Sequence, residues 1–200
     1  DCGAEITDFT VEDISYDKTN IILVCDVSGS MDGSPIQDLK TAVSMFVNDK
    51  TDKERIGLVT FSSSVEDVYG LDSTVEELNA AASSLDASGG TNMYDAVIHA
   101  ISMLEAENDA MNIIILMSDG NDGNSRSEST INANICQPCL NNGIVLYSIG
   151  LGNSVDSAYL DTFASGTGGS YLYVSDSQTL AAFYEYLHNL IAEVQRLAAP

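Results

Sequence analysis

The chain has 200 residues, of which 44% are hydrophobic, and its formal net charge at pH 7 is −23. This hydrophobic fraction excludes a disordered chain, and the length fits one domain with a substantial core. A surface this acidic repels phosphate backbones, so no nucleic-acid partner is expected. No apolar run reaches the roughly 18 residues that a membrane span requires.

Short apolar runs alternate with segments of helical periodicity along most of the chain. The runs predicted as strands are residues 21–25, 55–61, 65–69, 112–117, 143–149 and 171–174. The segments predicted as helices are residues 34–47, 75–85, 93–107, 128–140, 156–164 and 179–197. The first helix is expected to have Ser34 as its N-cap and Pro35 in its first position.

This alternation predicts an α/β fold, with a doubly wound, mostly parallel sheet, helices on both faces and one short antiparallel edge strand at residues 65–69. Residues 20–197 form the predicted domain, and residues 1–19 are expected to be a lead-in segment or a linker. Because the chain begins at Asp1 without a signal-peptide pattern, we expect a processed product or a piece of a larger protein. Ligands of such sheets bind at the carboxyl ends of the strands.

The stretch Asp26-Val27-Ser28-Gly29-Ser30 directly follows the first apolar strand. It presents one carboxylate and two hydroxyls on alternate residues, and Gly29 allows the backbone to bend between the serines. Hard oxygen ligands of this kind, few and mostly uncharged, suit a small divalent cation. The sequence therefore predicts a metal site at the end of this strand.

The same stretch resembles the D-x-S-x-S motif of the metal-ion-dependent adhesion site in von Willebrand factor A-type domains. That family also requires a threonine and an aspartate from two further loops. The chain offers Thr91 within Ser-Gly-Gly-Thr-Asn-Met-Tyr-Asp-Ala and Asp119 within Leu-Met-Ser-Asp-Gly. Each segment alone is typical of a turn or a helix cap, with Thr91 as a cap residue and Asp119-Gly120 as a turn. Their occurrence together, in the family's order, favours the metal site.

The resemblance implies a bound Mg²⁺, with Mn²⁺ or Ca²⁺ as alternatives. The implied ligands, direct or through water, are Asp26, Ser28, Ser30, Thr91 and Asp119. Two carboxylates only neutralise the ion, so it keeps an open position. In the resembled family an Asp or Glu side chain of a protein ligand fills that position.

The function implied by the resemblance is a cation-dependent adhesion module, extracellular or at a cell surface. The segment around Thr91 looks more like bacterial and inter-alpha-inhibitor-type members of the family than like integrin inserts, which favours a bacterial surface protein. An alternative is an intracellular assembly or chelatase-type subunit that partners an AAA+ ATPase and keeps its cysteines reduced. A third hypothesis is a domain whose metal only holds its loops together. In the resembled family the last helix, here residues 179–197, also shifts along the body, although a helix that merely covers the sheet would show the same apolar stripe.

We do not expect an enzyme. The sequence contains no G-x-S-x-G elbow, no phosphate-binding G-x-x-x-x-G-K-[ST] loop and no H-E-x-x-H motif. His99 and His188 both fall in predicted helices, where they are packed or solvated.

The cysteines favour an oxidising compartment. Cys25 lies in an apolar strand and is expected to be a buried thiol. Cys136 and Cys139 have C-x-x-C spacing, but no second ligand pair exists to complete a zinc site. A local disulfide between them, or one from Cys2 to either, is therefore expected.

Overall fold

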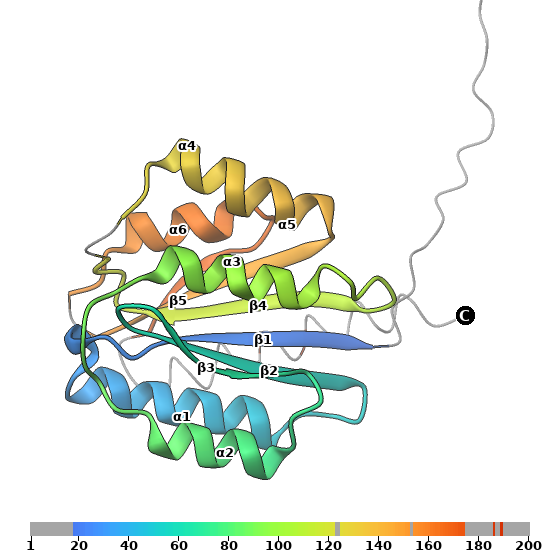
Figure 1. Ribbon diagram of the computed structural model, residues 1–200, viewed down its shortest axis with the longest axis horizontal. Helices are drawn as coiled ribbons and strands as arrows, with labels where there is room; N and C mark the ends of the chain where they lie inside the picture. Colours follow the sequence, from blue (N-terminus) through green and yellow to red (C-terminus); the bar gives the residue numbers. More distant parts are fainter. Residues whose placement is uncertain (1–17, 123–124, 153, 175–185, 187–188, 190–200) are drawn as a thin grey trace, which may run out of the picture.

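The computed structural model describes residues 18–122, 125–152 and 154–174, together with Tyr186 and Asn189. Its core is a six-stranded sheet in the order β3-β2-β1-β4-β5-β6 (Figure 1). The strands are β1 (Thr19–Asp26), β2 (Glu54–Phe61), β3 (Val65–Tyr69), β4 (Met111–Ser118), β5 (Ile144–Leu151) and β6 (Tyr171–Val174). All neighbours are parallel except β2 and β3, so the predicted sheet with one antiparallel edge strand is confirmed.

Helices cover both faces of this sheet (Figure 1). One face is covered by α1 (Ser34–Asn48) and α2 (Val75–Ser84). The other is covered by α3 (Met93–Leu104), α4 (Glu128–Ile131), η2 (Asn132–Cys136), α5 (Gln137–Asn141) and α6 (Ser157–Ser165). The short η1 (Gly29–Met31) follows β1. The predicted helix at residues 179–197 lies outside the described residues, apart from Tyr186 and Asn189.

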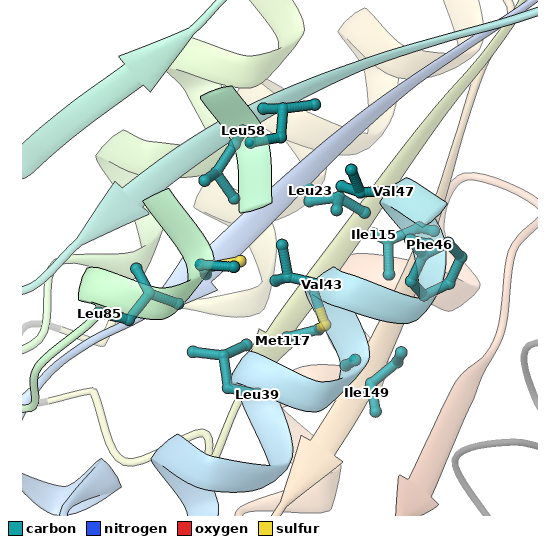
Figure 2. Packing of buried hydrophobic residues seen from close by; sticks show 14 of the residues in the cluster. Leu23, Leu39, Val43, Phe46, Val47, Leu58, Leu85, Ile115, Met117 and Ile149 are labelled. Carbon is teal, nitrogen blue, oxygen red and sulfur yellow. The ribbon is translucent and has the colours of Figure 1, made fainter. Parts of the chain in front are cut away.

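Burial on both faces explains why the four central strands β1, β2, β4 and β5 are mostly apolar. Every residue of β1 is buried, and alternate side chains enter opposite cores: Leu23 packs under α1 and α2, and Ile22 packs under α3. Figure 2 shows the first core, in which Leu39 and Val43 of α1 lie among side chains of the central strands. Each fully buried aliphatic side chain contributes roughly 1.5–3 kcal/mol to stability. Among the described residues, the structure contains no helix with the length and hydropathy needed to cross a membrane.

The start of α1 differs from the prediction. Gly33, not Ser34, is the N-cap, and Pro35 is the second helical residue. Gly33 has φ of 89°, a conformation that a serine rarely adopts, and the chain uses this glycine to turn into the helix. The capping box occurs instead at α2, where Thr74 and Glu77 exchange hydrogen bonds.

The predicted helix at residues 128–140 is also irregular. It is split into α4, a π-helical turn (η2) and α5, with Pro138 in the first turn of α5. A proline has no N–H to donate to the carbonyl four residues before it. The widened turn directly before Pro138 accommodates this missing bond.

A polar network joins the strands at the end of the sheet where β1, β2 and β4 begin. The buried Asn20 donates through Nδ2 to Oδ1 of Asn112 at 2.8 Å and accepts from Nε of Arg55 at 2.9 Å. Asn112 in turn donates to the backbone oxygen of Glu107 at 2.7 Å, and Arg55 forms an ion pair with the Glu107 carboxylate. α3 ends at Leu104, three residues before the predicted end, and Glu107 lies beyond the helix, where it makes these contacts with Asn112 and Arg55.

Candidate metal centre

The predicted ligands Asp26 and Asp119 lie at the ends of adjacent strands. The chain winds outward from β1 to β2 on one side and continues through β4 and β5 on the other, so β1 and β4 flank the topological switch point. Cys25 pairs with Met117 in this parallel ladder, which sets Asp26 beside Ser118. Ser118 donates its hydroxyl to Oδ2 of Asp26 at 2.5 Å. This side-chain hydrogen bond joins the ends of β4 and β1 at the switch point.

The two motif serines lie directly beyond Asp26. The backbone N–H of Ser28 donates to Oδ1 of Asp26 at 2.8 Å, which turns the chain back over the end of the strand. The hydroxyl oxygens of Ser28 and Ser30 are 3.1 Å apart. Ser28 is buried and Ser30 is exposed, so the pair forms a short row of oxygens from the interior to the surface.

The loop that carries Thr91 is fastened to the same turn. Gly29 donates its N–H to the backbone oxygen of Gly89 at 3.1 Å, and Ser88 donates to the backbone oxygen of Val27 at 2.8 Å. Gly89 has φ of 78°, and a Cβ at that position would lie only 3.0 Å from the hydroxyl of Ser62. Thr91 is buried, and the N-cap of α3 is Asn92, so Thr91 does not act as the helix cap.

Asp119 is held from its other side by the loop before α6. Its backbone oxygen accepts the N–H of Asp156 at 3.0 Å, and its Oδ1 accepts the N–H of Asn121 at 3.0 Å. Gly120 follows with φ of 77°, where a Cβ would meet the backbone oxygen of Asp156 at 2.8 Å. Among the described residues, no hydrogen bond to the second carboxylate oxygen of Asp119 is found, so this oxygen is left for water or a cation.

The buried negative charge at the site favours a bound cation. Asp26 is fully buried, and burial raises the pKa of its carboxyl from 3.8 to about 6, with a further contribution from the charge of Asp119. Hydrogen bonds from Ser118 and Ser28 lower this pKa and offset only part of the effect. Within the described ranges, no lysine or arginine forms an ion pair with Asp26. A buried carboxylate beside a second one, without a basic partner, is costly unless a positive ion is present.

The donor set fits magnesium better than a softer metal. Carboxylate and hydroxyl oxygens are hard ligands. In the part of the chain that the structure describes, no group of three or more His, Cys, Asp or Glu side chains gathers to hold a metal. The predicted site differs from such a group, because three of its five predicted ligands are the neutral hydroxyls of Ser28, Ser30 and Thr91.

Two residues of the centre were missed in the sequence. Ser118, which bonds Asp26, is a small polar residue at the end of an apolar strand, and this is a signal that could have found it. Ser63 accepts the N–H of Gly90 at 2.8 Å and so fastens the Thr91 loop to the turn between β2 and β3. Its place in a run of three serines gives no sign of this contact.

The expected disulfide between Cys136 and Cys139 is wrong. Cys25, Cys136 and Cys139 all carry free thiols, and Cys2 lies outside the described residues. Cys136 ends the π-helical turn and Cys139 lies in α5, where both are buried. Burial raises the pKa of both thiols, to about 12 for Cys139, which keeps them protonated and unreactive. The free thiols therefore do not support the oxidising compartment that the expected disulfide implied.

A six-stranded, mostly parallel sheet with helices on both faces and an Asp-x-Ser-x-Ser turn at its switch point defines the class of doubly wound α/β domains. Comparison with known families identifies the chain as a member of the von Willebrand factor type A domain family, whose sequence model matches residues 20–186.

Among curated proteins, the chain is 28% identical over 201 residues to inter alpha-trypsin inhibitor heavy chain 4 of Mus musculus. The match covers 94% of this chain and 21% of that protein, so the chain spans about a fifth of the length of this relative. Among solved structures, a von Willebrand factor type A protein from Catenulispora acidiphila has a TM-score of 0.74 at 21% identity, covering 90% of this chain and 43% of that one. The manganese-loaded TRAP protein of Plasmodium vivax has a TM-score of 0.65 at 17% identity, covering 86% and 74%.

Proposed function

We propose that this domain is a divalent-cation-dependent protein-binding module, whose protein ligand completes the coordination of the metal with an Asp or Glu side chain. The resident ion is Mg²⁺, with Mn²⁺ or Ca²⁺ as substitutes. Its ligands, direct or through water, are Asp26, Ser28, Ser30, Thr91 and Asp119. The domain acts outside the cell or at a cell surface as part of a larger protein, and it has no catalytic role.

One observation carries this proposal: Asp26 is fully buried and is paired with no basic side chain in the described ranges. Ser28 and Ser118 hold its carboxylate by hydrogen bonds. Burial and the charge of Asp119 raise the pKa of this carboxyl. A folded protein retains such a carboxylate when a bound cation compensates its charge. The hydroxyls of Ser28 and Ser30 supply neutral oxygens beside it. The solved structure of Plasmodium vivax TRAP, which has the same fold, is manganese-loaded, and this makes Mn²⁺ a suitable probe here.

The bound ion supplies a positive centre that accepts an oxygen ligand from outside. The protein itself holds both oxygens of Asp26 in place, positions the two serine hydroxyls and fixes the loops before Thr91 and after Asp119. Since two carboxylates balance the charge of a divalent ion, the ion is not saturated by negative ligands. An incoming carboxylate is then a better ligand than a neutral group.

Isothermal titration calorimetry with Mg²⁺, Mn²⁺ and Ca²⁺ tests the metal site. We expect saturable binding of at least one ion by the wild type and none by Asp26→Ala. Asp32→Ala is the matched control, because Asp32 is an exposed acid next to the motif that only caps the N–H of Gly33. Equal binding by wild type and Asp26→Ala would overturn the proposal.

A second measurement separates adhesion from a metal that only holds the loops. The metal-loaded protein is titrated with a short peptide that carries one Asp, before and after addition of EDTA. We expect binding only in the loaded state. Peptide binding that persists in EDTA would favour the hypothesis of a purely structural ion.

A further inference from the structure

The surface beside the metal centre carries an arginine that the proposed site does not use. We propose that the guanidinium of Arg126, stacked on Tyr94, forms a second carboxylate-binding subsite, so that the protein ligand presents two acidic side chains, one to the metal and one to Arg126. This inference rests on the proposed function, because the first acid is the one that binds the metal.

Charge balance is the first argument. The chain has 30 acidic and 7 basic residues, and only Arg55, Arg126 and Arg196 are basic after residue 53. Asp26 and Asp119 balance the charge of a divalent ion, which therefore binds an incoming carboxylate by direct coordination but does not attract it from a distance. The surrounding acidic surface repels such a ligand. A positively charged side chain at the edge of the metal centre then makes the binding of an acidic ligand more favourable.

The position of Arg126 is the second argument. It lines a cavity of about 430 Å³ together with Gly120 and Asn121, the two residues that follow Asp119. Its guanidinium lies 5.2 Å from the centre of the ring of Tyr94, three residues beyond Thr91. Arg126 therefore spans the gap between the loops that carry two of the proposed metal ligands.

The anchoring of Arg126 is the third argument. Its backbone N–H donates to the hydroxyl of Tyr159 at 3.1 Å, and the aromatic ring of Tyr94 orients its side chain. No ion pair of its guanidinium is found within the described ranges, and the side chain is exposed. The forked donors of an arginine held in this way match the two oxygens of a carboxylate.

Two acids also line this cavity, but both have local partners. Asp156 accepts the N–H of Tyr159 at 3.0 Å as the N-cap of α6. Asp122 accepts the hydroxyl of Tyr159 at 3.3 Å. The same tyrosine thus engages both carboxylates and the backbone of Arg126, and the arginine side chain remains directed toward Tyr94.

The test uses blocked peptides and the protein saturated with Mn²⁺. One peptide carries a single Asp. The others carry a second Asp one to four residues away, each with a matched peptide in which that second Asp is Asn. The affinity of each protein for Mn²⁺ is measured first, and peptide affinities are then compared for wild type, Arg126→Gln and Lys40→Gln. Lys40→Gln removes the same charge from α1, where Lys40 donates to the backbone oxygen of Ser83 and forms no ion pair within the described residues.

We expect at least one spacing of the two acids to bind wild type about fivefold more tightly than its Asn-matched peptide, as a charge-assisted contact at an exposed site would give. Arg126→Gln is expected to abolish this gain, and Lys40→Gln to retain it. The inference is overturned if no spacing gives a gain in wild type, or if Arg126→Gln keeps it. Failure of wild type to bind Mn²⁺ or the single-Asp peptide would instead overturn the proposed function.

Discussion

The hydroxyl of Ser118 lies 2.5 Å from Oδ2 of Asp26, and this contact joins β4 to β1 at the point where the sheet changes its direction of winding. Ser118 also accepts the N–H of Gly120 at 2.8 Å. One side chain thus fixes the buried carboxylate of the first loop and the backbone of the third. The geometry of the metal centre depends on a residue that we do not count among its ligands.

Ser118→Ala is therefore expected to weaken Mn²⁺ binding by about tenfold, because loss of a residue that orients a metal ligand typically has an effect of this size. Calorimetric titration with Mn²⁺ measures the change. Ser165→Ala is the control, since Ser165 lies in α6 and its hydroxyl donates only within that helix. Equal affinities in the two variants would mean that Asp26 is oriented without Ser118.

The stability of the metal-free protein is expected to depend on pH through Asp26. Burial raises the pKa of its carboxyl from 3.8 to about 6, so the folded state binds this proton more tightly than the unfolded chain does. The resulting stabilisation is fully present below pH 3.8 and is lost as the pH rises through about 6.

Asp26→Asn removes this titration. In EDTA, the free energy of unfolding of the variant is expected to increase relative to that of wild type as the pH rises from about 4 to about 7.5, by up to about 3 kcal/mol. Urea unfolding at a series of pH values measures the difference. Saturating Mg²⁺ is expected to restore the stability of wild type at neutral pH and to leave the variant unchanged. A difference between the two proteins that does not vary with pH would contradict the assignment.

Ser63 is expected to act on the metal through the Thr91 loop. Its hydroxyl accepts the N–H of Gly90, so Ser63→Ala removes one of the hydrogen bonds that hold this loop, while those of Gly29 and Ser88 remain. We expect Mn²⁺ affinity to fall by about fivefold with little change in the midpoint of urea unfolding, since the lost hydrogen bond is exposed. Ser64→Ala, in the same turn, is the control. A variant that loses stability but not affinity would show that Ser63 serves only the turn.

The Asn20–Asn112 pair is expected to stabilise the sheet without affecting the metal. Asn20→Ala leaves Oδ1 of Asn112 without its partner in a buried position, which costs about 1–3 kcal/mol. The double variant with Asn112→Ala is expected to lose less than the sum of the two single variants, because no orphaned amide remains. Urea unfolding measures all three, and Mn²⁺ titration is expected to give the wild-type affinity. Additive losses would argue against a coupled pair.

The order of strands and helices could be predicted because buried parallel strands appear in the sequence as short, continuous apolar runs. The run before Asp26 is apolar throughout, as burial on both faces requires. At the candidate site, the structure brings Asp26, Ser28 and Ser30 together, as their spacing in the motif predicts, whereas the roles of Thr91 and Asp119 as metal ligands stay predictions.

Other features depend on contacts that the sequence does not display. Gly33 takes the cap position because of a local turn, although Ser34 has the better capping side chain. The π-helical turn before Pro138 and the contacts of Glu107 with Asn112 and Arg55 leave no periodic pattern in the sequence. Ser63 could not be connected with Gly90 because 27 residues separate them along the chain.

The central position of β1 also has a mechanical consequence. This strand runs from the residues that precede Thr19 directly to Asp26, with β2 and β4 bonded along both of its edges. A tensile load between the N-terminal segment and a partner held at the far end of β1 would act along the strand. It would shear both parallel ladders at once, instead of opening them one bond at a time. The time for which the folded domain withstands such a load is then set by the rate of forced unfolding. The load acts in the direction in which the hydrogen bonds of both ladders must break together.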